Sequence, residues 1–344
     1  LPDTLHGSIE QLDIDQHSLL AACEGAFSHH PALQTLAFKC ADSNALVALL
    51  AAVADPTRAD GQRATRDTAK VFTPATYAVA DFYRNTSYRG ASWSADRRRL
   101  LVSSNRTGIW NAYSIPVSGG AAQPLTQSTT DAVFAQSYFP HDDRIVFTSD
   151  HGGNELTHVY VRNADGTTKD VTPGEKLKAG FLGWAGDDRS FFVSTNERDP
   201  KYFDVYDVTA DSFARTLLFR NDSGFNLGPV SRDRRFLAAV KSRTTSDADI
   251  YLVELKTGSV KNITVHTGNV NNSPADFSPD GKSLLFLSDS GREFASLRSY
   301  DLASGRTTMV YEQPWDVLGA DYSKGGRYLT VYVNEDSRAV AKTP

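Results

Sequence analysis

The chain has 344 residues, 40% of them hydrophobic and 22% charged, which is the composition of a globular protein and not of a disordered or fibrous one. Its formal net charge of −5 gives no overall positive field for binding nucleic acid. No apolar run approaches the roughly 20 residues that a membrane span needs. Two cysteines, Cys23 and Cys40, are too few for a disulfide scaffold or a four-cysteine zinc site, and the sequence leaves open whether they pair or stay free.

The first 74 residues differ in composition from the rest of the chain. Alanine, leucine, glutamine and histidine are frequent there, and the apolar spacing is helical. Short helices are predicted over residues 8–24, 32–39 and 43–54. We therefore divide the chain into a helical or irregular region, 1–74, and a second region, 75–344.

The segment 36–54 has features of a secretory signal. Lys39 precedes the apolar stretch 45–54, which ends in the small-residue triplet 52–54. A short helix of alanine and leucine is the favoured alternative, because Asp42 interrupts the positive region. If the segment is a signal, the mature protein begins after residue 54 and is exported to the periplasm or secreted.

The strongest pattern in the chain is an internal repeat that begins after residue 75. In its clearest copy, 277–286, an aromatic residue precedes a polar Ser-Pro-Asp-Gly turn that leads into an apolar strand. The pattern opens six times, at Trp93, Tyr138, Trp184, Val230, Phe277 and Tyr322. These positions are 45, 46, 46, 47 and 45 residues apart, a regularity that chance explains poorly.

A further strand is predicted in each of the first five copies, centred on a tyrosine. The tyrosines are Tyr113, Tyr160, Tyr206, Tyr251 and Tyr300. A polar residue stands two positions before each of them, namely Asn111, His158, Asp204, Asp249 and Arg298. We expect the tyrosines to pack in the core and the polar residues to satisfy buried backbone groups between the repeats.

Four strands in a period of about 45 residues are typical of a β-propeller blade. The predicted fold is all-β: a propeller of four-stranded blades with five complete repeats and a partial sixth, preceded by the short helical region. Stacking blades round an axis buries both faces of each sheet. The sixth copy is expected to end after its second strand, and the segment 77–80 is a candidate strand for closure. We expect the ring to be incomplete or irregularly closed.

Several stretches outside the repeat resemble a known family. The run 81–85, Asp-Phe-Tyr-Arg-Asn, is similar to the motif before the first blade in the prolyl oligopeptidase family of serine peptidases, especially its bacterial acylaminoacyl- and dipeptidyl-peptidase-like members. Further similar stretches are 103–113, 153–160, 195–200 and 247–251. The resemblance covers roughly residues 75–340. The Ser-Pro-Asp-Gly repeat is less specific, because it also occurs in TolB-like propellers.

The resemblance implies a two-part enzyme in which an α/β-hydrolase domain with Ser, Asp and His follows the propeller. The chain contains no Gly-x-Ser-x-Gly sequence, the turn that holds the nucleophile of such a domain. We therefore assign no catalytic residue and expect this chain to be inactive alone. The implied partners are a hydrolase domain, of the same or a longer chain, and a peptide substrate.

The loops between second and third strands are the candidate binding surface, because they all open on one face of a propeller. Their charged residues are Arg106, Glu155, Glu197, Arg198, Arg243, Arg292 and Glu293. These residues either face a substrate or a hydrolase domain, or they form a solvated rim with salt bridges between loops, which is the favoured alternative.

The histidines and paired carboxylates suggest no catalytic or metal site. His158 occupies the polar position of its repeat, so a structural role is favoured. Asp142 and Asp143, like Asp187 and Asp188, stand where every copy has turn residues. No metal or cofactor is predicted.

The sequence is consistent with two functions. The first is a non-catalytic propeller portion of a serine peptidase that gates the access of substrates to the hydrolase domain. The alternative is a TolB-like propeller that binds a protein partner as a scaffold. A propeller enzyme with a metal in its channel is disfavoured, because the repeats bring no set of histidines and carboxylates together.

Overall fold

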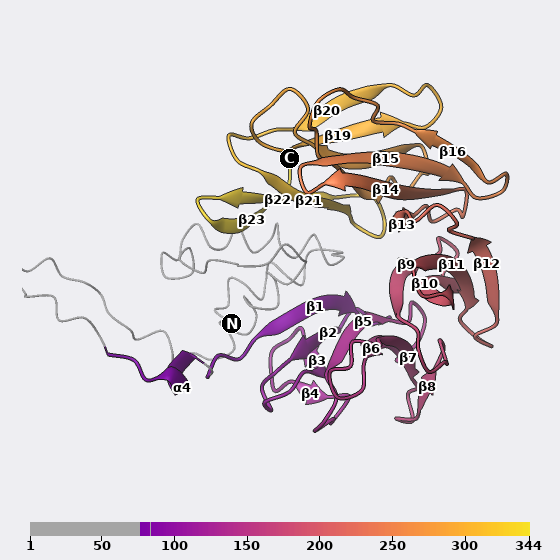
Figure 1. Ribbon diagram of the computed structural model, residues 1–344. Coiled ribbons are helices and arrows are strands. Elements are labelled where there is room, and N and C mark those ends of the chain that lie inside the picture. Colours follow the sequence, from indigo (N-terminus) through magenta and orange to yellow (C-terminus); the bar gives the residue numbers. More distant parts are fainter. Residues whose placement is uncertain (1–75, 83) are drawn as a thin grey trace, which may run out of the picture.

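The computed structural model describes residues 76–82 and 84–344 (Figure 1). One short helix, α4 (Val79–Phe82), lies in this part, and almost everything else is strand or turn. The strands form six antiparallel sheets that follow one another round a common axis, as the blades of a propeller do (Figure 1). None of the helices in the described ranges is long and apolar enough to cross a membrane.

Each blade is an up-and-down meander of consecutive strands. Blade 1 contains β1 (Tyr88–Trp93), β2 (Arg99–Ser104), β3 (Asn111–Pro116) and β4 (Gln123–Pro124). Blade 2 contains β5 (Val133–Tyr138), β6 (Ile145–Ser149), β7 (His158–Arg162) and β8 (Thr168–Asp170). Blade 3 contains β9 (Ala179–Trp184), β10 (Ser190–Asp199), β11 (Tyr202–Thr209) and β12 (Arg215–Phe219).

The second half of the propeller repeats this plan. Blade 4 contains β13 (Asn226–Val230), β14 (Phe236–Thr244), β15 (Asp247–Glu254) and β16 (Ser259–Asn262). Blade 5 contains β17 (Asn272–Phe277), β18 (Ser283–Ser288), β19 (Ser296–Asp301) and β20 (Thr307–Tyr311). Blade 6 contains β21 (Val317–Tyr322), β22 (Leu329–Glu335) and β23 (Arg338–Lys342).

The structure confirms the predicted period. Each of the six repeat positions is the last residue of the first strand of a blade, and each of the five tyrosines lies in a third strand. The turn after the first strand is built by local hydrogen bonds, as in blade 5, where Ser278 Oγ accepts from the backbone of Ser283 at 2.9 Å. Gly281 of that turn has φ +66°, a left-handed conformation that glycine adopts without strain.

The sixth blade differs from the expectation that it ends after its second strand. A third strand, β23, pairs with β22 from Val331↔Lys342 to Glu335↔Arg338. The two residues between them, Asp336 and Ser337, both have positive φ, which is the backbone of a tight two-residue hairpin turn. The Asp-Ser pair lacks the glycine that usually marks such a turn, so the sequence pattern missed this hairpin.

The prediction of a closing strand over 77–80 is wrong in the described part of that segment. The chain forms the helical turn α4 there, and the Asp81 carboxylate accepts from the Ala78 backbone at 2.9 Å. A side chain that satisfies a free backbone N–H at a helix start favours a turn over an extended strand. The predicted helices and signal segment of 1–74, with Cys23 and Cys40, lie outside the described residues.

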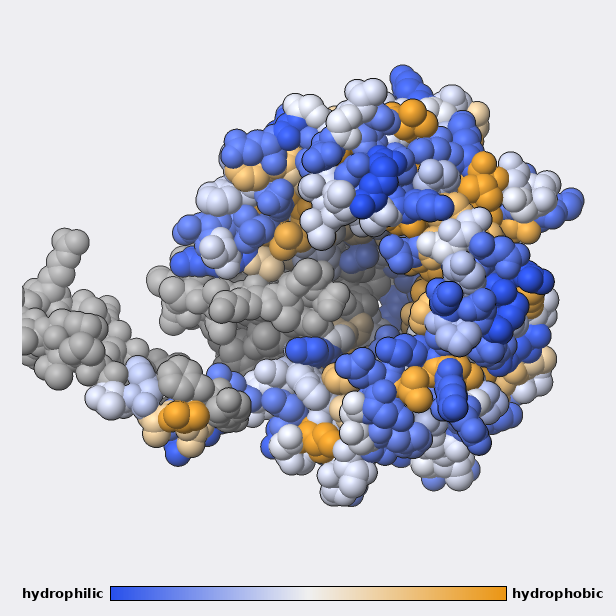
Figure 2. All heavy atoms as spheres, in the orientation of Figure 1, coloured by the Kyte–Doolittle hydropathy of each residue, from blue (hydrophilic) through white to orange (hydrophobic). Residues whose placement is uncertain are grey.

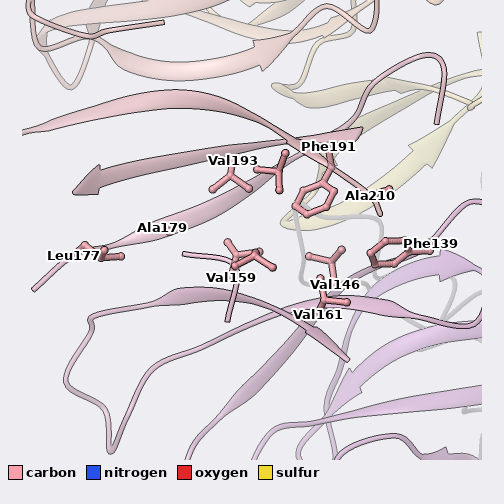
Figure 3. Packing of buried hydrophobic residues seen from close by; sticks show 11 residues of the cluster. Phe139, Val146, Val159, Val161, Leu177, Ala179, Phe191, Val193 and Ala210 are labelled. Carbon is pink, nitrogen blue, oxygen red and sulfur yellow. The ribbon is translucent and has the colours of Figure 1, made fainter. Parts of the chain in front are cut away.

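The core of the molecule lies between blades. Each of the five consecutive pairs, from blades 1 and 2 to blades 5 and 6, shares a buried apolar cluster within the described ranges. Between blades 2 and 3, Phe139 and Phe191 lie among the valines of both sheets (Figure 3). The Phe139 ring packs edge-on against Trp184 and Phe191, with ring centroids 4.9 and 6.2 Å apart. The face seen in Figure 2 is mostly hydrophilic and is hollowed between the inner edges of the blades.

Hydrogen bonds between equivalent positions fix the register of neighbouring blades. Ser92 Oγ accepts from the backbone N–H of Tyr138 at 3.0 Å, and one blade is thereby tied to the next. Asp276 accepts in the same way from Tyr322, at 3.1 Å between blades 5 and 6. Burial raises the pKa of the Asp276 carboxyl, although the N–H of Tyr322 favours the charged form.

Replacing Phe191 by alanine tests how much the packing between blades contributes to stability. Because Phe191 is completely buried, we expect F191A to lower the free energy of unfolding by about 3–5 kcal/mol. Leu217, which is 46% exposed on β12, is the matched control, and L217A should change stability by less than about 0.5 kcal/mol. Urea unfolding followed by tryptophan fluorescence measures both, and similar losses would contradict a core between blades.

Substitutions of Asp276 test the contribution of its hydrogen bond between blades 5 and 6. Asparagine keeps an acceptor for Tyr322 and removes the buried charge, so D276N should be at least as stable as the natural chain at pH 7. Alanine leaves the backbone N–H without a partner, so D276A should lose about 1–3 kcal/mol. Since the folded pKa is raised, the advantage of D276N should shrink as the pH falls and Asp276 protonates. Thermal melts at pH 4 and 7 that showed the opposite trend would contradict this assignment.

Candidate functional site

The propeller has two faces that carry different connections. We call the face that carries the second-to-third-strand connections and the linkers between blades the loop face. We call the opposite face, with the first-to-second and third-to-fourth turns, the turn face. All seven charged residues singled out from the sequence lie on the loop face.

The structure places three of these residues in strands and not in loops. Glu197 and Arg198 belong to the end of β10, and Arg243 belongs to the end of β14. These strands continue past the apolar core because their polar ends pair with β11 and β15, as in Lys241↔Asp249 and Asp199↔Tyr202. The prediction of loops at these positions is therefore wrong, since backbone pairing extends the hairpins beyond the hydrophobic pattern.

Blade 3 holds a paired arginine on the loop face. The Arg198 guanidinium donates two hydrogen bonds to the Asp204 carboxylate, at 2.6 and 2.8 Å, and lies 3.3 Å from Asp222. Asp204 also accepts from the backbone of Asn221 at 2.8 Å, so it connects the third strand to the linker that leaves the blade. Burial opposes ionisation of Asp204, but the guanidinium and this N–H hold its pKa below the ordinary value.

Blade 4 repeats this arrangement and adds a histidine. Arg243 donates to Asp247 at 2.6 and 2.7 Å and to Asp249 at 2.6 Å. Hydrogen bonds from Arg243 and His266 lower the pKa of Asp247 to about 2. His266 is 9% exposed, and its two ring nitrogens lie 2.8 Å from the Thr264 carbonyl and 2.9 Å from Asp247.

The surroundings of His266 favour its protonated form. Nδ1 faces the Thr264 carbonyl and Nε2 faces the Asp247 carboxylate, whereas the Arg243 guanidinium, 3.0 Å from Nε2, opposes a positive charge on the ring. The Thr264 carbonyl, followed by the Asp247 carboxylate, raises the pKa of His266 against the effect of burial. The sequence did not single out this residue, because its linker position shows no spacing to Asp247 or Asp249 that would mark a shared cluster.

The other predicted residues make weaker or single contacts. Arg106 lies over the Tyr113 ring at 5.7 Å, and Glu155 lies 3.7 Å from Lys178. Glu197 pairs with Arg215 at 2.6 Å, and Arg292 pairs with Glu312. Glu293 is exposed. Most of the seven residues are therefore tied to neighbours in their own blade.

Of the polar residues two positions before the tyrosines, Asn111 and Asp204 bind backbone groups of the linkers, as predicted, whereas Arg298 binds a loop carbonyl of its own blade. Asn111 accepts from the Ser128 backbone at 2.8 Å, and His158 lies 2.7 Å from Asp170. Like Asp204 and Asp249, they bind the end of the fourth strand or the linker after it. These side chains satisfy polar groups where one blade passes into the next.

The turn face differs in that ion pairs cross between blades. Lys324 of blade 6 lies 2.8 Å from Asp188 of blade 3, and these blades stand three apart in the series. The Arg232 guanidinium of blade 4 donates to the Lys324 carbonyl at 2.6 Å. Asp188 is thus held in a turn, as predicted. Because these contacts tie the turn face together across the ring, the loop face is the better candidate for receiving a ligand.

The described ranges offer little further support for a bound ion or ligand at these residues. No group of three histidine, cysteine or acidic side chains there could hold a metal ion. An open cavity of about 570 Å³ lies on the turn face between blades 5 and 6, lined by residues such as Asp280, Arg306 and Tyr322. None of the predicted site residues lines it.

The raised pKa of His266 predicts a pH dependence of stability. The unfolded pKa is near 6.5 and the folded one is higher, so the stabilisation is complete at low pH and is lost as the pH rises through the folded pKa. The gap in melting temperature between the natural chain and H266Q should therefore be larger at pH 5.5 than at pH 8.5. A gap that stayed constant would show that His266 does not titrate with folding.

Comparisons with known proteins agree with this architecture. No family model matches the chain. Dipeptidyl aminopeptidase BIII from Pseudoxanthomonas mexicana is 30% identical over 209 residues, which are 60% of this chain and 30% of that protein.

A prolyl endopeptidase structure matches with a TM-score of 0.58 at 15% identity, over 76% of this chain and 41% of the other. TolB from Acinetobacter baumannii matches more weakly, with a TM-score of 0.46 at 17% identity, over 74% and 56%. The chain is therefore similar in sequence to a dipeptidyl aminopeptidase and in fold to part of a prolyl endopeptidase, as the sequence resemblance indicates.

Proposed function

We propose that this chain is the propeller portion of a serine peptidase and that it controls the access of peptides to a hydrolase domain. The observation that carries the proposal is the 30% identity with dipeptidyl aminopeptidase BIII, of which the matched region spans 30%. The likeness in fold to a prolyl endopeptidase is consistent with it. A fold alone does not assign an activity, so the sequence likeness has the greater weight.

The geometry supports the loop face as the side that meets the substrate and the hydrolase domain. Three of its arginines, Arg198, Arg243 and Arg292, are held by carboxylates of their own blades, so these parts of the rim are charged and fixed. The buried clusters between blades hold the sheets in fixed positions. A rigid rim over an active site admits flexible peptides and excludes folded proteins on steric grounds.

The chain alone should not hydrolyse peptides, since it lacks the Gly-x-Ser-x-Gly turn. A fluorophosphonate probe, which labels activated serines, should leave the 344-residue chain unlabelled and should label a longer product of the same gene. Labelling of the 344-residue chain would overturn the assignment of no nucleophile. Labelling of neither product would favour a scaffold that binds a protein partner.

Gating needs a separate measurement on the longer product. We expect it to cleave a short peptide and to leave a folded protein that contains the same sequence intact. The same protein, reduced and unfolded beforehand, is the matched control and should be cleaved slowly. Equal rates on the folded and unfolded forms would contradict a gating propeller.

A further inference from the structure

At one position on the loop face, blade 5 carries a positive side chain where blades 3 and 4 carry a negative one. Two residues before the tyrosine of the third strand, blades 3 and 4 carry Asp204 and Asp249, each paired with an arginine of the same hairpin. In blade 5 the corresponding residue is Arg298 on β19. The position that holds a neutralised carboxylate in blades 3 and 4 holds a cation in blade 5.

Arg298 uses only part of its hydrogen-bonding capacity. Its guanidinium donates to the Ser290 carbonyl at 2.5 Å and weakly to Ser296 Oγ at 3.5 Å. A guanidinium has five N–H donors in a planar fork, so several remain for another acceptor. Within residues 76–82 and 84–344, no carboxylate forms an ion pair with Arg298.

A second arginine of the same blade, Arg292, acts electrostatically on Arg298. Burial, followed by the like charge of Arg292, lowers the pKa of Arg298, and the carboxylate of Asp289 offsets only part of this effect. Arg292 is itself paired with Glu312. A bound anion would relieve the repulsion between the two arginines, because it would place an opposite charge beside a half-buried guanidinium.

Aromatic side chains lie on the same face of the blade. Phe294, in the loop with Arg292, and Trp315, in the linker to blade 6, have ring centroids 6.5 Å apart. Trp315 is 37% exposed, and the backbone of Ala295 donates to Asp316 at 2.9 Å, which joins this loop to the linker. Cationic and aromatic side chains on the same face of one blade suit a ligand with both anionic and apolar parts.

We propose that Arg298 forms an anion site on the loop face of blade 5 that binds the carboxylate of a peptide. The two N–H groups of a guanidinium edge match the two oxygens of a carboxylate. The inference rests on the proposed function, because peptides reach this face only if it covers a peptidase site. The carboxylate is either the carboxyl terminus of the peptide or an acidic side chain.

Titration of the full 344-residue chain tests the site, with tryptophan fluorescence and calorimetry as readouts. The probes are acetyl-Ala-Ala-Ala with a free carboxyl terminus, the same peptide as its amide, and acetyl-Ala-Asp-Ala amide. Stronger binding of the first or the third probe than of the neutral amide identifies the source of the carboxylate. Equal binding of all three, or no binding at all, would overturn the proposal.

Variants of Arg298 connect the binding to this residue. R298Q should weaken binding of the favoured probe by at least about tenfold, as expected for losing hydrogen bonds to a charged group. R298K keeps the charge without the planar fork, so its affinity for the probe should fall by an intermediate amount. R298K also tests the site if the glutamine variant misfolds. Arg327, an exposed arginine of the turn face, is the matched control, and R327Q should bind like the natural chain. Unchanged binding to R298Q would overturn the site.

The test of the anion site and the test of the proposed function can give different results. Carboxylate binding that depends on Arg298, without probe labelling of any longer product, would uphold the anion site and reject the peptidase. Labelling of the longer product without such binding would uphold the peptidase and reject the site.

Discussion

Apolar packing between neighbouring blades is the interaction on which the rest of the molecule depends. A single four-stranded sheet has two faces to bury and cannot bury either by itself. Residues such as Phe139, Val193 and Phe191 have buried environments only because two sheets meet there. The strands that carry the candidate site are thus held in place by contacts made well away from it.

The polar residues before the third-strand tyrosines connect that packing to the loop face. Asn111 and Asp204 bind backbone groups of the linkers that lead to the next blade. Buried backbone groups that lack partners are costly, so these side chains also stabilise the passage from one blade to the next. Arg298 stands in the same position with the opposite charge, and this exchange is what distinguishes blade 5.

Charge is arranged differently on the two faces. Lys324 and Asp188 cross the ring on the turn face, whereas Arg243 and Asp247 pair within one blade on the loop face. Exposed ion pairs contribute little to stability, so their importance lies in which segments they tie together. The turn face is joined across the axis, and the loop face keeps its charged hairpins as separate units, which suits a surface that meets a ligand.

The sequence by itself determined the period, the strand order and the side chains that face the core, because each blade repeats a local pattern of apolar strand and polar turn. The hairpin that forms β23 was missed, since Asp336 and Ser337 adopt positive φ without a glycine. Only the tertiary structure decided the charge pairing. His266 meets Asp247 and Asp249, and Lys324 meets Asp188, through the spatial arrangement of strands and blades, and no spacing along the chain encodes such a contact.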